Sequence, residues 1–475
     1  TICAIRLGLG HLLCWTGIMT QAFILESVLH SVNHREPDRI GAFDGFYGLA
    51  IMNVGYMLAN LVVPSLTNYM RCKSIMGLGS LCFFAFSVSF QFLNRYVYFV
   101  GCAVNGIGYA LINIGYNGYL TEISTRTTLA HNQALSWAIL CPCMFFNGVV
   151  YTVVTALGST DSPHSQFREY GDDEIRYFYI AFALLGALAT IVFFTIPRRR
   201  VEGNIAASNE KAETFAKQMQ LMFSVLFDRR VLLIAPFYLY IGLYYSFWNS
   251  ILPTTLQFTK SLSENIFLIA YFGMTFAAGS LTMSVSTVLL SKRITDYCLY
   301  PLITINTIIH MVIYVITVLV IPEWSTVRQN ADPSLLIPPG PVPIVIIAFL
   351  LGMGDAANNS ARGVICSLLL PTRRTQSIAA SRVFHALSSS VLFFASPALS
   401  VYSYVIILTV ALLCSTVSFL YTCAHVKRFE RKESQALSAA TASFPVFEIH
   451  AKRPVTVDSF THGANTSPPI ARKYF

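Results

Sequence analysis

Twelve long apolar blocks constrain the fold of this chain more than any other feature of its sequence. Each is about as long as the ~20 residues that an α-helix needs to cross a hydrocarbon core of ~30 Å. The blocks are unbroken, whereas the strands of a membrane β-barrel alternate apolar and polar residues over shorter segments. They lie at approximately 5–28, 46–66, 74–93, 97–120, 133–156, 177–196, 231–252, 266–290, 299–321, 342–370, 379–398 and 401–423. The sequence therefore predicts an all-α membrane protein with twelve transmembrane helices.

Composition argues against a soluble protein. Hydrophobic residues make up 55% of the 475 residues and charged residues only 12%, whereas soluble domains carry about 25% charged residues. Too little polar surface would remain to cover soluble domains of this size. The sequence shows no catalytic triad, nucleotide-binding loop or metal-ligand spacing in a segment large enough to fold alone. We therefore expect a protein that is not an enzyme and that binds no cofactor or metal.

The distribution of Lys and Arg predicts the orientation in the membrane. If the N-terminus is cytoplasmic, 24 of these residues lie in cytoplasmic segments and 7 in outer loops, while Arg362 lies inside a span. Basic residues concentrate on the cytoplasmic side of membrane proteins, so we expect both termini to be cytoplasmic. The net charge of +9 is then a sign of topology and of contact with the lipid bilayer, and we expect no nucleic-acid partner. The plasma membrane and internal membranes both fit.

The chain divides into two sets of six spans, at residues 1–196 and 231–423. The connection at 197–230 contains a stripe of apolar residues at helical spacing, which predicts an amphipathic helix along the membrane surface or, alternatively, a helix that binds a partner protein. The tail at 424–475 is rich in Ser, Thr, Pro and basic residues without periodicity. We expect this tail to be disordered and cytoplasmic.

A short motif occurs once in each set of six spans. The fourth span reads Gly-Ile-Gly-Tyr-Ala-Leu-Ile-Asn from Gly106 to Asn113, and the tenth reads Gly-Met-Gly-Asp-Ala-Ala-Asn-Asn from Gly352 to Asn359. Both fit G-x-G-x-A-x-x-N at equivalent spans, 246 residues apart. Small residues are also common wherever membrane helices pack closely, but the equivalent positions favour an internal duplication.

The tenth span carries the strongest candidate site. Asp355, Asn359 and Arg362 stand at i, i+4 and i+7, so they share one helical face, and Asn358 lies beside them. Charged groups are costly in lipid, so this stripe must face protein or a water-filled cavity. We expect it to bind a cation or polar solute opposite Asn113, with Arg362 balancing charge or contributing to a gate. The alternative is an Asp355–Arg362 ion pair, formed directly or through water, that only fixes helix packing.

Four other titratable residues lie within predicted spans. His11, His310 and His385 are possible members of a proton relay, although a single histidine in a membrane more often bonds a neighbouring helix. Glu26 is a candidate for solute or ion binding because carboxylates in spans tend to be functional. It lies near the end of the first span, so it could instead stand in water at the outer mouth.

Several short segments form an ordered set along the spans: Asn60-Leu61-Val62-Val63-Pro64-Ser65, Gly118-Tyr119-Leu120-Thr121-Glu122, Trp137-Ala138, Tyr240-Ile241-Gly242-Leu243, Phe247-Trp248, Leu351-Gly352-Met353-Gly354-Asp355 and Asn359. In their order and spacing they resemble the uncoordinated-ninety-three-like branch of the major facilitator superfamily, and the resemblance runs from the first span to the twelfth. It implies two six-helix bundles of the major facilitator type. The charged signature that typical members carry between spans two and three is absent, and Tyr69-Met70-Arg71-Cys72-Lys73 stands in its place.

The resemblance implies two functional classes. In the first, the two bundles rock around a central site and move a small solute or ion by alternating access. In the second, the protein transports nothing and acts as a regulatory or escort subunit for an ion channel or a membrane receptor. Because fold does not fix function, both classes stay open here, and the polar stripe in the tenth span favours the first.

Overall fold

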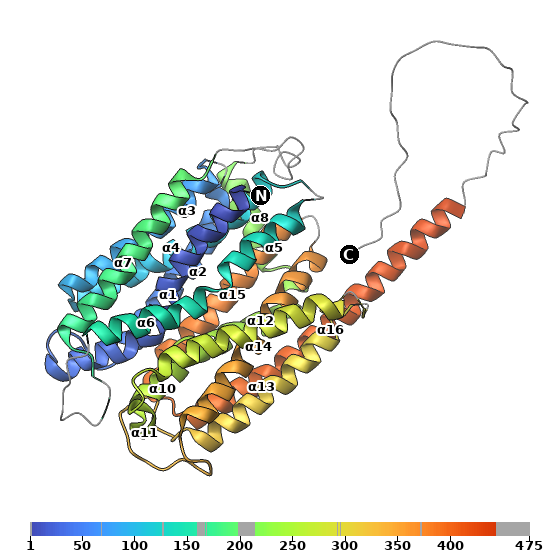
Figure 1. Ribbon diagram of the computed structural model, residues 1–475. Helices are drawn as coiled ribbons and strands as arrows, with labels where there is room; N and C mark the ends of the chain where they lie inside the picture. Colours follow the sequence, from blue (N-terminus) through green and yellow to red (C-terminus); the bar gives the residue numbers. More distant parts are fainter. Residues whose placement is uncertain are drawn as a thin grey trace, which may run out of the picture. The chain divides into compact units, whose positions relative to one another are not determined.

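The computed structural model describes residues 2–67, 69–125, 128–158, 167, 169–197, 214–291, 293–294, 296–370 and 373–442, and its named elements are all helices. Within these residues, twelve helical stretches are long and apolar enough to cross a membrane, which confirms the predicted number. The elements in chain order are α1 (Ile2–Arg35), α2 (Asp44–Leu66), α3 (Cys72–Ser89), η1 (Phe90–Phe92), α4 (Arg95–Glu122), α5 (Leu129–Leu140), α6 (Cys143–Gly158), α7 (Asp172–Thr195), α8 (Phe215–Leu226), α9 (Arg229–Ser246), η3 (Phe247–Ile251), α10 (Leu252–Phe258), α11 (Lys260–Ser263), α12 (Leu268–Ser291), α13 (Pro301–Val320), α14 (Pro341–Leu369), α15 (Arg374–Ala395), η5 (Ser396–Ala398) and α16 (Val401–Ala442) (Figure 1).

We call the spans up to Thr195 the first half and the spans from Arg229 to His425 the second half. The end of the bundle where α2 and α7 begin is called the Asp44 face, and the opposite end is called the Arg71 face. Which face is cytoplasmic stays a prediction from the distribution of basic residues. Large apolar side chains on the outer surface of the helices are exposed, such as Leu184 on α7 and Val417 on α16, as expected for surfaces that contact lipid.

Two spans are interrupted near a proline. The fifth span consists of α5 and α6, which meet at Cys141 and Pro142. The seventh span contains η3, a π-helical turn that ends two residues before Pro253. Because proline lacks an N–H and its ring clashes with the carbonyl four residues earlier, the helix ladder must open locally. The wider π turn provides that opening in the seventh span.

The duplicated glycines hold the same packing position in both halves. A Cβ atom on Gly106 would lie 2.0 Å from the carbonyl oxygen of Met52, and a Cβ atom on Gly352 would lie 2.0 Å from the carbonyl oxygen of Phe276. In both cases the span carrying the motif therefore touches the backbone of the span two before it. Only glycine permits this approach, so the two copies of the motif make equivalent packing contacts, as an internal repeat requires.

Basic side chains close one end of α7 at the Arg71 face. Lys73 Nζ donates to the carbonyl oxygens of Phe194 at 3.1 Å and Ile196 at 3.3 Å, and Arg6 donates to Thr195 O at 3.3 Å. The last carbonyls of a helix lack partners within the helix and carry partial negative charge. These cations therefore stabilise the end of the sixth span.

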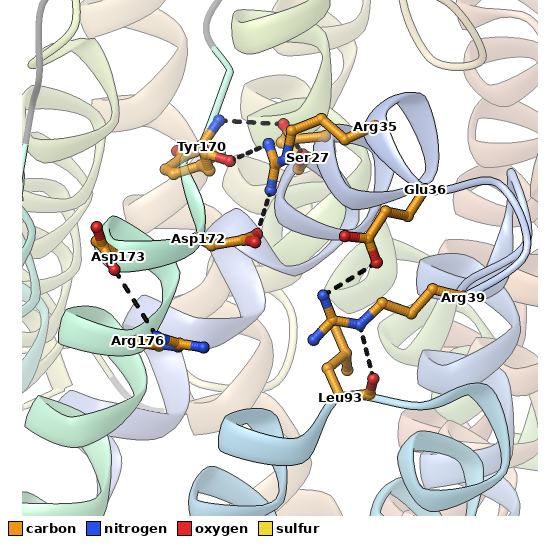
Figure 2. Close-up of polar contacts among 10 residues, drawn as sticks. Ser27, Arg35, Glu36, Arg39, Leu93, Tyr170, Asp172, Asp173 and Arg176 are labelled. Atoms are coloured by element: carbon orange, nitrogen blue, oxygen red, sulfur yellow. Dashed lines mark hydrogen bonds and ion pairs between the residues drawn. The ribbon is translucent and has the colours of Figure 1, made fainter.

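Ion pairs tie the helix ends together at the Asp44 face (Figure 2). Arg35 at the end of α1 pairs with Asp172 at the start of α7, with an N–O distance of 2.7 Å, and also donates to the carbonyl oxygen of Tyr170. Arg39 donates to the carbonyl oxygen of Leu93 at 2.8 Å. The charged loops of this face therefore fix α1, α4 and α7 relative to one another.

Two segments differ from the boundaries expected from sequence. The first helix continues to Arg35, two turns beyond the expected end. The last helix continues to Ala442, so residues 424–442 of the expected disordered tail are helical; Ala, Glu, Lys, Gln and Leu in this stretch are strong helix formers. Residues 443–475 lie outside the described part of the chain.

Candidate functional site

Side chains on one face of α14 form a hydrogen-bonded chain. Asn359 Nδ2 donates to Asp355 Oδ2 at 3.0 Å, and Arg362 donates to Asn359 Oδ1. All three side chains are half-buried, and the spacing of four and then three residues places them together as predicted. Among the described residues no direct ion pair joins Asp355 to Arg362; Asn359 connects them instead. The described part of the fold therefore contains no direct ion pair between Asp355 and Arg362.

A second arginine lies close to this chain on α15. Arg382 Nη1 donates to Tyr56 Oη on α2 at 2.8 Å, so it links the second half to the first. Because α14 packs against α15, Arg382 lies on the helix next to Arg362, and His385 follows Arg382 by three residues on the same face of α15. His385 in turn packs against Tyr245 on α9, with ring centroids 5.1 Å apart. The site therefore includes two guanidinium groups and one histidine in addition to Asp355.

Aromatic side chains from the first half face this cluster. Tyr109 on α4 lies 3.5 Å from Tyr245, measured between the hydroxyl oxygens. Its ring packs edge-on against Trp15 on α1, with centroids 5.1 Å apart, and against Tyr56, with centroids 5.8 Å apart. These contacts place α1, α2, α4, α9, α14 and α15 around one site between the halves. Amphipathic rings of this kind can contact the apolar parts of a solute and still offer hydroxyl groups.

Asn113 sits where the repeat predicts but does not reach across the site by itself. Its Nδ2 donates to Tyr109 O, one turn earlier on α4, at 2.8 Å. The side chain is half-buried, and its hydrogen bond runs along α4 and not to another helix. Asn113 therefore fixes the helix that presents Tyr109, as Asn359 does for Asp355.

Asn358 points away from the site. It is fully buried, and its Oδ1 accepts a hydrogen bond of 2.9 Å from Asn306 Nδ2 on α13. Successive residues on a helix are about 100° apart, so a neighbour in sequence lies on another face. Asn358 holds α13 against α14 and is a packing contact between spans of the second half.

The three candidate histidines lie in different surroundings. Only His385 belongs to the cluster around Asp355. His310 is fully buried behind it, where Nδ1 hydrogen-bonds Tyr240 Oη at 2.8 Å. His11 lies in the first half, where Nδ1 lies 3.0 Å from Leu7 O and the ring packs against Tyr116 at 4.6 Å. No hydrogen bond among the described residues connects one of these histidines to another.

Glu26 is enclosed by protein, so the expectation that it could stand in water at the outer mouth is wrong. Its side chain is only 3% exposed, because α1 continues for two more turns and α2 crosses it closely at Gly45. The adjacent Asp44 is held by Arg95 in a bidentate pair at 3.0 and 3.1 Å. Glu26 lies eleven residues beyond Trp15, about 16 Å along the helix, and so belongs to the Asp44 face.

Sequence reasoning missed the residues that complete the site from other helices. Arg382 lies near the start of the expected span 379–398, where its charge serves as an indicator of orientation, and Tyr56, Tyr109 and Tyr245 resemble the many other aromatic residues of the spans. The only available signal was the position of Tyr109 in the repeated motif, where Asp355 stands in the second copy.

Comparison with known proteins agrees with the fold and the motifs. The family model described as ion channel regulatory protein UNC-93 matches residues 36–420. UNC93-like protein MFSD11 of Xenopus laevis is 22% identical over 441 residues, which cover 87% of this chain and 94% of the relative. UNC93-like protein 3 of Arabidopsis thaliana is 20% identical over 409 residues, which cover 83% of this chain and 82% of the relative.

Solved transporter structures share the architecture. The xylose transporter XylE from E. coli, in an inward open conformation, matches with a TM-score of 0.59 and 15% identity over 88% of this chain and 95% of that chain. The peptide transporter POT in complex with sulfate matches with a TM-score of 0.60 and 11% identity over 90% and 95%. Because this family model matches most of the chain, the protein belongs to the UNC-93 family, and it shares the fold of these solved transporters.

Proposed function

We propose that this protein moves a small polar solute or ion across the membrane by alternating access around the Asp355 site. The observation that carries the proposal is the hydrogen-bonded chain of Asp355, Asn359 and Arg362, half-buried in a span and faced by side chains of the opposite half. Packing alone needs no charges at this depth, and charged groups in spans are costly unless they serve a site or a cavity. Asp355 and Asn359 are the proposed contacts with the solute.

The contacts between the halves fit a site that is closed toward the Asp44 face. There Tyr170 Oη donates to Gln257 Oε1 at 2.7 Å, and His30 packs against Phe258 with ring centroids 4.7 Å apart. Nearer the middle, the rings of Phe23 and Trp248 meet at 6.4 Å. Alternating access then requires these contacts to separate while contacts at the Arg71 face form.

A regulatory role is the second candidate, and the family match favours it, because the matching model is described as an ion channel regulatory protein. The structure also gives Lys73, in the segment that replaces the usual charged signature, a capping role on α7. In this reading the protein binds a channel or receptor, and the Asp355 cluster serves stability.

Uptake by purified protein in liposomes separates the two candidates. A panel of radiolabelled amino acids, organic acids, sugars and inorganic ions should reveal at least one solute that enters the liposomes. Asp355→Asn should abolish that uptake while leaving the thermal midpoint and monodispersity near those of the original protein. Asp332→Asn removes the same charge from an exposed loop and should transport normally.

The regulatory reading predicts the opposite result. No solute of the panel would then enter the liposomes, and Asp355→Asn would retain the effect on a partner channel in co-expressing cells. Full uptake by Asp355→Asn would also contradict the proposed transport site.

A further inference from the structure

Two arginines lie at the same depth within the bundle. Arg362 is seven residues before the end of α14 at Leu369, and Arg382 is eight residues after the start of α15 at Arg374. At ~1.5 Å per residue both lie about 10–12 Å inside the Arg71 ends of their helices. Both are half-buried. Arg382 bonds Tyr56 of the first half, so its guanidinium lies where the two halves meet, and Arg362 lies at the same depth on the neighbouring helix.

The described residues satisfy only a small part of these guanidinium groups. Arg362 donates to Asn359 Oδ1, and Arg382 donates to Tyr56 Oη at 2.8 Å. Each of these hydrogen bonds uses one N–H of the five that a guanidinium carries. No carboxylate among the described residues lies within ion-pair distance of either arginine, and both acceptors are neutral oxygens.

The local charges do not balance. Arg362 and Arg382 carry like charges at the same depth on the neighbouring helices α14 and α15, and like charges repel each other. Asp355 is seven residues from Arg362 on the same helix, about 10 Å deeper, and its carboxylate is occupied by Asn359. The two guanidinium groups and the one carboxylate leave the cluster with one excess positive charge. A membrane-embedded site with excess positive charge and unused N–H donors is complementary to an anion.

We infer that Arg362 and Arg382 bind the carboxylate of a small solute, and that Asp355 receives an amine or hydroxyl group of the same solute. The inference rests on the transport site proposed above and specifies the class of solute for it: a small carboxylate with a hydrogen-bond donor a few atoms away. Planar guanidinium groups suit carboxylates because they form two parallel hydrogen bonds. Tyr109 and Tyr245 then flank the carbon skeleton.

Equilibrium binding tests this inference without requiring transport. The purified full-length protein is titrated with glycine, acetate, ethanolamine and ethylene glycol at constant ionic strength, and binding is followed by calorimetry and by tryptophan fluorescence, since Trp15 and Trp248 border the cluster. Saturable binding is expected for glycine and more weakly for acetate, because acetate lacks the donor for Asp355. Ethanolamine and ethylene glycol lack the carboxylate and should not saturate.

Variants assign the binding to the two arginines. Arg382→Gln and Arg362→Gln should each weaken acetate and glycine binding by at least about tenfold. Arg362→Lys keeps the charge but not the planar fork and should give an intermediate loss, which preserves a test if Arg362→Gln does not fold. Asp355→Asn should weaken glycine binding but leave acetate binding equal or tighter. Arg293→Gln, at an exposed position on the Arg71 face, is the control of equal charge and should bind as the original protein does.

Three results would overturn the inference. The first is the absence of saturable binding of either carboxylate by the original protein. The second is unchanged binding by Arg382→Gln, which would identify the two arginines as hydrated residues without a ligand. The third is equal binding of ethanolamine and acetate. Carboxylate binding without uptake into liposomes would leave the inference standing and refute transport, so the two proposals fail separately.

Discussion

The fourth and tenth spans share one framework but differ in their chemistry. In both, the first glycine of the repeated motif lets the span touch the backbone of the span two before it. In both, the asparagine that ends the motif donates to the carbonyl oxygen one turn earlier, at 2.8 Å for Asn113 and 3.0 Å for Asn359. The repeat therefore conserves the positions that decide packing and helix geometry.

The two copies differ at the position that faces the site. Tyr109 of the fourth span corresponds to Asp355 of the tenth, at the same offset of 246 residues. The first half thus presents a neutral phenol there, whereas the second presents a charge. Tyr116 corresponds to Arg362, but it bonds Ser136 and packs against His11 within the first half. The difference teaches that a duplicated scaffold can keep its packing while only one copy carries the ionic groups.

The largest expected effect concerns the shared framework. Gly106→Ala and Gly352→Ala each place a Cβ atom 2.0 Å from a backbone carbonyl oxygen, so both should strongly lower the thermal midpoint or prevent folding, whichever half is altered. Gly363→Ala is the control, because a Cβ atom there meets nothing within 4 Å and alanine favours a helix by about 1 kcal/mol. A mild effect of Gly106→Ala together with a severe effect of Gly352→Ala would contradict the structural equivalence of the two halves.

The next effect concerns the positions that differ. Asp355→Asn should reduce solute uptake by at least about tenfold, because it removes a charged hydrogen-bond acceptor from the proposed site. Tyr109→Phe removes a hydroxyl whose partner is 3.5 Å away, and uptake should fall by less than about threefold. Initial uptake rates, corrected for the amount of protein in the liposomes, provide the measurement. Equal losses for both variants would mean that the two halves contribute symmetrically.

A smaller effect distinguishes packing from binding on the tenth span itself. Asn358→Ala leaves buried Asn306 without its partner and should lower stability by about 1 kcal/mol, since hydrogen bonds between membrane helices contribute modestly. Thermal unfolding of purified protein should detect this change, whereas glycine binding should stay unchanged. Loss of binding without loss of stability would place Asn358 in the site after all.

The smallest effect compares two basic residues of the Arg71 face. Lys73→Gln removes a cap from α7, and stability should fall by about 0.3–1 kcal/mol, the usual range for a charge at a helix terminus. The side chain of Arg293 has no hydrogen bond or ion pair among the described residues, so Arg293→Gln should leave the thermal midpoint unchanged. Equal midpoints for the two variants would show that the α7 cap contributes nothing measurable.

Local patterns predicted most of the fold and part of the site. The number of spans follows from apolar length, and the pairing of Asp355 with Asn359 follows from their spacing on one helix. The contribution of Arg382 and Tyr56 could not be predicted, because it depends on the packing of α15 against α2, and these two helices are far apart in the sequence. The burial of Glu26 was missed for the same reason, since the covering segment at Gly45 belongs to another helix.

The cation caps on α7 have a consequence for experiments on membrane insertion. Arg6 and Lys73 belong to the group of basic residues whose distribution predicts orientation, and they also bond the carbonyl oxygens at the end of the sixth span. Replacing them changes two quantities at once: the charge that the insertion machinery reads and the strength with which a finished helix is held. Charge reversal at Arg293 therefore tests orientation alone. Charge reversal at Lys73 does not, because a misoriented protein and a correctly inserted but less stable protein would both lower the signal of a topology assay.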